Sequence, residues 1–142
     1  RRSDMKDIVN TKIKFREPFR PFAPSVLAEE ADHYFELSDA ENSQPARFML
    51  LVVPVREGEQ DNIPAVNHMG TARIQTVHSD TSPLYHRLIR GFGDATGTPM
   101  LMNTSFNVRG EPVVNTPENA LDTFINSGID TLVMDRFIID KS

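Results

Sequence analysis

The chain has 142 residues, of which 39% are hydrophobic and 25% charged, and its formal net charge is -5 at pH 7. This size and composition are typical of one globular domain with its own hydrophobic core. The sequence contains no cysteine, which excludes disulfides, thiolate metal sites and cysteine nucleophiles. Its longest apolar run, residues 48–55, is too short to cross a bilayer, so we expect no membrane association and a cytoplasmic location. Because the sequence starts with Arg1-Arg2 and no methionine, we expect a piece of a longer chain.

The first half of the chain contains several predicted elements. Three prolines predict an extended segment over residues 13–22. The apolar spacing within residues 26–35 predicts a short amphipathic helix. A polar loop is expected over residues 38–45 and a buried strand over residues 48–55. A further strand is predicted over residues 72–77.

The second half carries two clear helix starts. Ser82-Pro83 and Thr116-Pro117 each pair a capping residue with a proline at the first helical position. Gly97 and Gly128 are the expected ends of these two helices. Short strands are predicted over residues 100–102, 112–114, 131–134 and 137–139. Strands that alternate with helices favour an α/β fold, and we expect a mixed sheet.

A basic cluster near the start is the first candidate site. Four cations and one acid fall within nine residues, and on an acidic chain such a cluster predicts a local anion site. The alternative is the solvated face of an edge strand, with Phe15 pointing to the core. The cluster comprises Lys12, Lys14, Arg16, Arg20 and Glu17.

A polar segment after the strand at 100–102 is the second candidate. Ligands of α/β proteins bind where strands end, and in an extended chain Asn103, Ser105 and Asn107 would share one face. Arg109-Gly110 follows and adds a guanidinium beside a flexible position. The alternative is a polar loop that satisfies its own turn amides. Both interpretations remain open at this point.

Other possible sites are weaker. A glycine turn at His68-Met69-Gly70 leads to Arg73, which is either an oxyanion contact or an exposed arginine of a hairpin. The four histidines lack the spacing of metal ligands, so no metal site is expected. The chain contains no G-x-S-x-G, phosphate-loop or dinucleotide fingerprint.

Long ordered strings in the chain resemble a known family. They are KFREPFRPFAPSVLAEEADHYF, NHMGTARIQTV and GTPMLMNTSFNVRGEPVVNTPENALDTFINSGIDTLVM. Together they resemble the C-terminal domain of the O-carbamoyltransferases that modify nodulation factors and antibiotics. The resemblance implies a YrdC-like fold, a twisted mixed α/β sheet with flanking helices, as a single domain over residues 1–142. It also implies an N-terminal ASKHA-like domain in the full-length chain as partner; a homodimer is left open.

The resemblance also implies a reaction. Carbamoyl phosphate and ATP, with Mg2+ carried by the nucleotide, give carbamoyl adenylate, and the N-terminal half passes the carbamoyl group to an acceptor hydroxyl. The Lys-x-Arg and Ser-x-Asn patterns of YrdC proteins correspond to Lys14-Phe15-Arg16 and Ser105-Phe106-Asn107. The residues then expected to be catalytic are Lys14, Arg20, Arg73 and Arg109. Those expected to bind substrate or nucleotide are Arg16, Asn103, Thr104, Ser105, Asn107 and His68.

One departure from the family pattern concerns the turn before Arg73. The family reads His-x-Asp-Gly there, whereas this chain has His68-Met69-Gly70 and lacks the acid. Two alternatives to a carbamoyl-adenylate-forming domain are an adenylating domain with another small donor and a nucleotide- or RNA-binding module without chemistry. The absence of tryptophan and the pI of about 5.3 argue against RNA.

Overall fold

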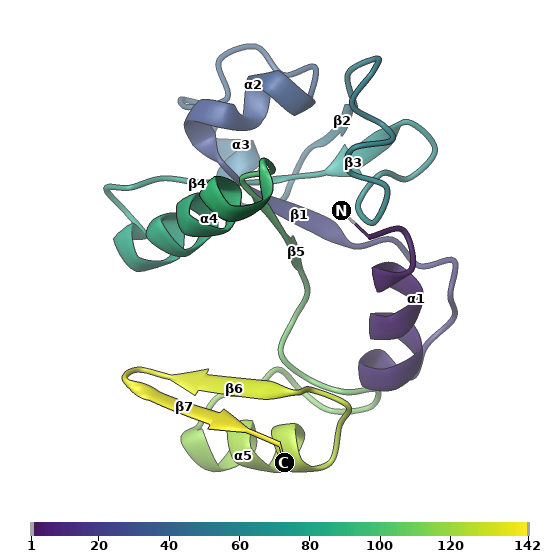
Figure 1. The fold of residues 1–142 in the computed structure, drawn as a ribbon, viewed down its shortest axis with the longest axis vertical. Helices are drawn as coiled ribbons and strands as arrows, with labels where there is room; N and C mark the ends of the chain where they lie inside the picture. Colours follow the sequence, from purple (N-terminus) through teal and green to yellow (C-terminus); the bar gives the residue numbers. More distant parts are fainter. Residues whose placement is uncertain (1, 142) are drawn as a thin grey trace. The chain divides into compact units, whose positions relative to one another are not determined.

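The computed structural model describes residues 2–141, which form two compact units (Figure 1). The first unit consists mainly of the continuous segment Pro21–Thr104. The second combines Asp4–Arg20 with the chain from Ser105 onward. The two units leave open whether the chain counts as one domain, so the single-domain expectation stays a prediction.

The first unit is organised around a three-stranded sheet in the order β4-β1-β5. β1 (Ala23–Leu27) pairs in parallel with β4 (Gln75–Val77) and antiparallel with β5 (Met100–Asn103). The sheet is therefore mixed, and the α/β expectation is confirmed. A second pair, β2 (Val52–Pro54) and β3 (Thr71–Arg73), is antiparallel.

Helices pack against this sheet and form the hydrophobic core together with it. α4 (Pro83–Thr96) begins at the predicted proline and ends at Gly97, whose φ of 75° is left-handed. Its Ile89 packs with Leu27 and Val77. A larger apolar cluster includes Val26 and Phe35 and also contains side chains of short helices. These short helices are α2 (Ala31–Tyr34), which η2 (Ala28–Glu30) precedes, and α3 (Gln44–Arg47).

Three predictions for the first unit were partly wrong. The helix predicted over residues 26–35 loses its start to β1, because β1 is buried on both faces and so shows no strand alternation. The strand predicted over residues 48–55 begins only at Val52, and Phe48 and Leu50 are 68% and 74% exposed. The strand predicted over residues 72–77 is two strands that pair with different partners.

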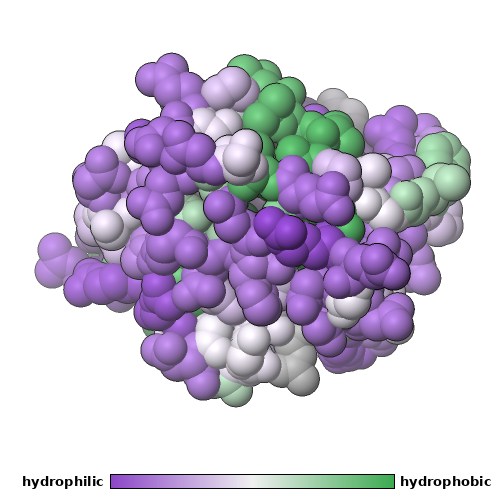
Figure 2. All heavy atoms as spheres, turned by 90° about the horizontal axis from the view of Figure 1, so that it is seen from above, coloured by the Kyte–Doolittle hydropathy of each residue, from purple (hydrophilic) through white to green (hydrophobic). Residues whose placement is uncertain are grey.

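Several large apolar side chains are exposed, among them Phe19, Phe48 and Leu50. Figure 2 shows a face that is mostly hydrophilic, with its apolar side chains gathered largely in one area. None of the helices in residues 2–141 combines the length and the apolarity needed to cross a bilayer.

The second unit joins the two ends of the described chain. α1 (Met5–Val9) continues into a π-helix, η1 (Asn10–Lys14), and α5 (Pro117–Ile125) is followed by a hairpin of β6 (Thr131–Met134) and β7 (Phe137–Asp140). Thr116 caps α5 as predicted, since its hydroxyl accepts the Asn119 amide at 3.2 Å. The backbone amide of Gly128 donates to the carbonyl of Lys12 at 3.1 Å and so fixes η1 to the turn after α5. The strand predicted over residues 112–114 is absent from the structure.

The basic segment is not the extended strand that its prolines predicted. Residues up to Lys14 are helical, and Phe15 adopts left-handed backbone angles with φ 48°. Phe15 is 50% exposed and Lys14 only 5%. The edge-strand alternative is therefore wrong, because it required the opposite placement of these two side chains.

Candidate functional site

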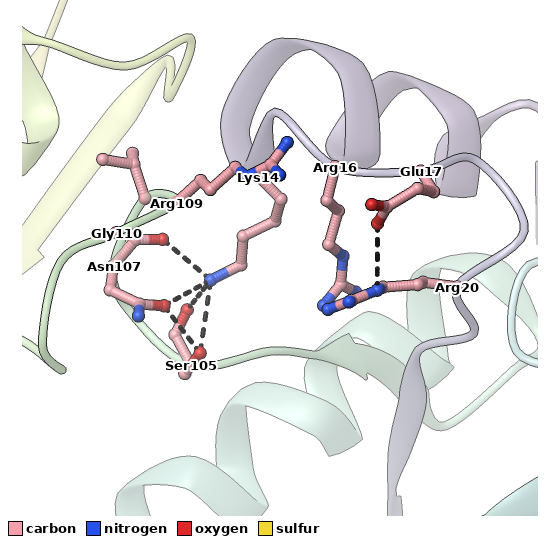
Figure 3. A pocket seen from close by; sticks show the side chains of 9 residues that line it. Lys14, Arg16, Glu17, Arg20, Ser105, Asn107, Arg109 and Gly110 are labelled. Carbon is pink, nitrogen blue, oxygen red and sulfur yellow. Dashed lines mark hydrogen bonds and ion pairs between the residues drawn. The ribbon is translucent and has the colours of Figure 1, made fainter.

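A cationic pocket of about 240 Å³ lies within the second unit (Figure 3). It brings together the basic segment and the polar segment that the sequence analysis identified, although 91 positions separate Lys14 from Ser105. Four cations and one acid face it. The lining residues are Lys14, Arg16, Glu17, Arg20, Ser105, Asn107, Val108, Arg109 and Gly110.

Lys14 connects the two segments. Its ammonium Nζ donates to the carbonyl oxygen and side-chain oxygen of Asn107 at 2.8 and 2.7 Å. It also donates to the carbonyl of Ser105 and lies 3.3 Å from the Ser105 hydroxyl. All four acceptors are neutral oxygens, so dipoles rather than a carboxylate hold this charge. Burial, followed by the nearby charge of Arg16, lowers the pKa of Lys14.

Asn10 fixes the conformation of the basic segment through side-chain hydrogen bonds. Its side chain is fully buried. The oxygen Oδ1 accepts from Nε of Arg16 at 2.7 Å, and the nitrogen Nδ2 donates to the carbonyls of Arg20 at 3.1 Å and Pro18 at 3.3 Å. The sequence analysis missed this residue. The only signal for it is a polar side chain between the apolar positions Val9 and Ile13.

Arg16 and Arg20 concentrate positive charge at the pocket. Burial, and then the charge of Arg20, lowers the pKa of Arg16. Nε of Arg20 lies 3.1 Å from a carboxylate oxygen of Glu17, the acid of the pocket. A hydrogen bond from its own backbone and then the Arg20 charge hold the pKa of Glu17 below its ordinary value.

Arg109 lies in a turn that hydrogen bonds hold in place. Its Nη1 donates to the carbonyl of Phe15 at 3.3 Å, and Gly110 beside it has φ 86°. The carbonyl of Glu111 accepts from Asn107 at 2.9 Å, and one Glu111 carboxylate oxygen accepts from the Thr123 hydroxyl of α5 at 3.3 Å. The loop that carries Arg109 is thus tied to a helix.

The remaining predicted site residues belong to the first unit. Nδ2 of Asn103 donates to Oε1 of Gln75 at 2.7 Å, and Oγ of Ser25 donates to the same oxygen at 2.7 Å. Asn103 therefore takes part in a polar cluster across the three strands of the sheet. Arg73 is exposed on β3, and His68 pairs through its backbone with Thr71. Thr104 is exposed and ends this unit.

No ligand set for a metal is apparent in the described part of the chain. Within residues 2–141 no three histidine or carboxylate side chains are grouped so that they could hold an ion. The carboxylates nearest the pocket have other partners, since Glu17 contacts Arg20 and Glu111 braces its loop.

Comparison with known proteins places the chain in a family. The family described as carbamoyltransferase C-terminus matches residues 1–141. The nodulation protein NolO of Bradyrhizobium diazoefficiens is 43% identical over 99% of this chain, and NolNO of Sinorhizobium fredii is 45% identical over 96%. An uncharacterized Synechocystis protein is 44% identical over 100%. The chain spans only 20% to 26% of the lengths of these relatives. The chain belongs to the carbamoyltransferase C-terminus family.

Proposed function

We propose that this chain is the part of an O-carbamoyltransferase that forms carbamoyl adenylate from carbamoyl phosphate and ATP. The observation that carries the proposal is the convergence of Lys14, Arg16, Arg20 and Arg109 on one pocket with a single acid. Like charges gathered in this way repel one another; the pKa of Arg16 is lowered by burial first and by the charge of Arg20 second. A bound phosphate would relieve that repulsion.

The size of the pocket suggests what part of the substrates it receives. Pockets that enclose drug-sized ligands measure roughly 300–1,000 Å³, and this one measures about 240 Å³. It suits phosphate or carbamoyl groups rather than a whole nucleotide. In the proposal, the adenosine extends beyond it.

The chemistry proposed for the pocket needs no protein nucleophile. Carbamoyl phosphate and water give carbamate and phosphate, and a carbamate oxygen then displaces pyrophosphate from the α-phosphorus of ATP. Both reactants are anionic, so the guanidinium groups would offset their repulsion and hold them in line. Lys14 would act mainly by fixing the Ser105–Asn107 loop that closes the pocket. Transfer to an acceptor hydroxyl would take place in the part of the relatives that this chain does not span.

Calorimetric titration with ATP and carbamoyl phosphate in Mg2+ buffer tests the proposal. Each charge-assisted contact contributes roughly 1.5–3 kcal/mol, so Arg109→Ala should weaken binding by about 10- to 100-fold. Arg136→Ala is the matched control, because Arg136 is 83% exposed between β6 and β7 and contacts only its neighbour Asp135 among the ion pairs of the described residues. This variant should bind like the wild type.

Two results would overturn the proposal. One is a folded wild-type chain that binds neither ligand, and the other is equal binding by the two arginine variants. Release of pyrophosphate from the ternary mixture separates catalysis from binding alone. Binding without release would favour the nucleotide-binding module that the sequence analysis left open.

A further inference from the structure

Asn10 is a buried polar residue, and the hydrogen bonds of its side chain to other described residues go to the segment that carries the cations. Its three side-chain hydrogen bonds go to Arg16, Pro18 and Arg20. Its backbone carbonyl also accepts the amide of Arg16 at 3.1 Å. Two of its hydrogen-bond partners, Arg16 and Arg20, line the pocket.

We propose that Asn10 is a positioning residue of the anion pocket, which acts by fixing the guanidinium of Arg16 and the backbone of Arg20. The inference rests on the proposed function. It assigns to the site a residue that none of the family patterns quoted above contains.

The chemistry of the amide explains why asparagine occupies this position. A guanidinium can only donate, so Arg16 requires an acceptor, whereas the carbonyls of Pro18 and Arg20 require donors. One amide side chain supplies both. A carboxylate would lack the donors and a lysine the acceptor. Because Asn10 is 0% exposed, water cannot take over either role without entering the interior.

The segment needs such a brace because it has no regular structure. The helix ends at Lys14. Apart from the amides of Phe15 and Arg16, which donate to the carbonyl of Asn10, the backbone between Phe15 and Arg20 makes one turn hydrogen bond, from Arg20 to Glu17 at 3.2 Å. Two arginines that repel each other across this stretch would otherwise spread apart. Fixed geometry is what makes a guanidinium useful against phosphate oxygens.

Pyrophosphate binding to the 142-residue chain, measured by calorimetry, tests the role of Asn10 through a double-mutant cycle. Asn10→Leu keeps the approximate volume and the charge but removes the polar contacts of the side chain. We expect it to weaken binding about tenfold or more, the loss expected for one charge-assisted contact, and Arg16→Gln to do the same. Because Asn10 acts partly through Arg16, the loss in the double variant should be smaller than the product of the two single losses.

A control separates positioning from general stability. Leu132→Ala removes a buried side chain from the apolar cluster of the same unit, so it should lower thermal stability and leave pyrophosphate affinity unchanged. Asn10→Ser, which retains one oxygen, should give an intermediate loss. It also replaces Asn10→Leu in the cycle if the leucine variant does not fold.

The possible outcomes are distinct. Unchanged affinity in the Asn10 variants, or losses that multiply in the double variant, would refute this inference while the proposed function stands. A loss in Leu132→Ala equal to that in Asn10→Leu would refute it as well. A folded wild-type chain that binds no pyrophosphate, ATP or carbamoyl phosphate would instead refute the proposed function.

Discussion

Replacing Lys14 with methionine would remove the ammonium that joins the two segments of the second unit while keeping an apolar stem of similar length. The wild-type ammonium has three protons and donates to oxygens of Ser105 and Asn107. Hydrogen bonds to a charged group contribute roughly 1.5–3 kcal/mol each, which gives about 4–9 kcal/mol before opposing effects. Burial of the charge opposes this, and Ser105, which is exposed, can turn to water. We therefore expect a net loss of about 2–3 kcal/mol in the free energy of unfolding of this unit.

Hydrogen exchange resolved by peptide is the assay of choice, because a chain with two compact units need not melt in one step. Protection should fall in α5 and in the β6–β7 hairpin, and should be unchanged in α4 of the first unit. Lys12→Met is the matched control, since Lys12 is exposed two residues away in the same π-helix. Equal protection of α5 in the two lysine variants would refute the view that Lys14 holds the unit together.

Three further predictions concern packing and pH. Gly93→Ala would place a methyl group 2.7 Å from a side-chain atom of Pro99 and should destabilise the first unit by about 1–3 kcal/mol. Gly91→Ala in the same helix meets nothing within 4 Å and should stabilise it by roughly 0.5–1 kcal/mol; denaturant titration of both variants checks the pair. Burial alone would raise the pKa of Glu29, but hydrogen bonds and cationic neighbours hold it below its ordinary value. The stability that Glu29 contributes is therefore present above the pKa of the unfolded state and is lost as the pH falls through the pKa of the folded state. Glu29→Gln should abolish this pH dependence. We expect the contribution to stay below about 1 kcal/mol because the side chain is 37% exposed. The pKa of Lys14 is lowered from the ordinary lysine value of 10.5, so pyrophosphate affinity should begin to fall at a pH below that value. An affinity that stays constant up to pH 10.5 would contradict the placement of this ammonium.

The helices that could be predicted from the sequence are those with local signals. α4 and α5 both begin at a proline that follows a serine or threonine, although only Thr116 makes a side-chain capping hydrogen bond. These signals act within one turn of the chain. β1 was mistaken for a helix start because a strand buried on both faces is simply apolar. Its assignment as a strand depends on β4 and β5, which lie far away in the sequence.

The candidate pocket shows the same division. Its residue types could be predicted, since cations and short polar side chains at two places suggest one anion. The way they meet could not be predicted, because it depends on left-handed backbone angles at Phe15, a residue type that rarely adopts them. That single conformation lies between Lys14, which is buried, and Arg16, which is half-buried at the same pocket. Asn10 could not be identified from the sequence, because its role depends on the groups that its side chain hydrogen-bonds in the folded chain.

The discontinuity of the second unit has a consequence for synthesis on the ribosome. The Lys14 segment leaves the exit tunnel well before its partners, since 91 positions separate Lys14 from Ser105. At roughly 5–20 residues per second, the lysine waits about 5–20 s for the oxygens that will hold it. The continuous segment Pro21–Thr104 emerges complete during that interval and can fold first. The pocket can therefore be assembled only after Ser105, Asn107 and Arg109 have emerged.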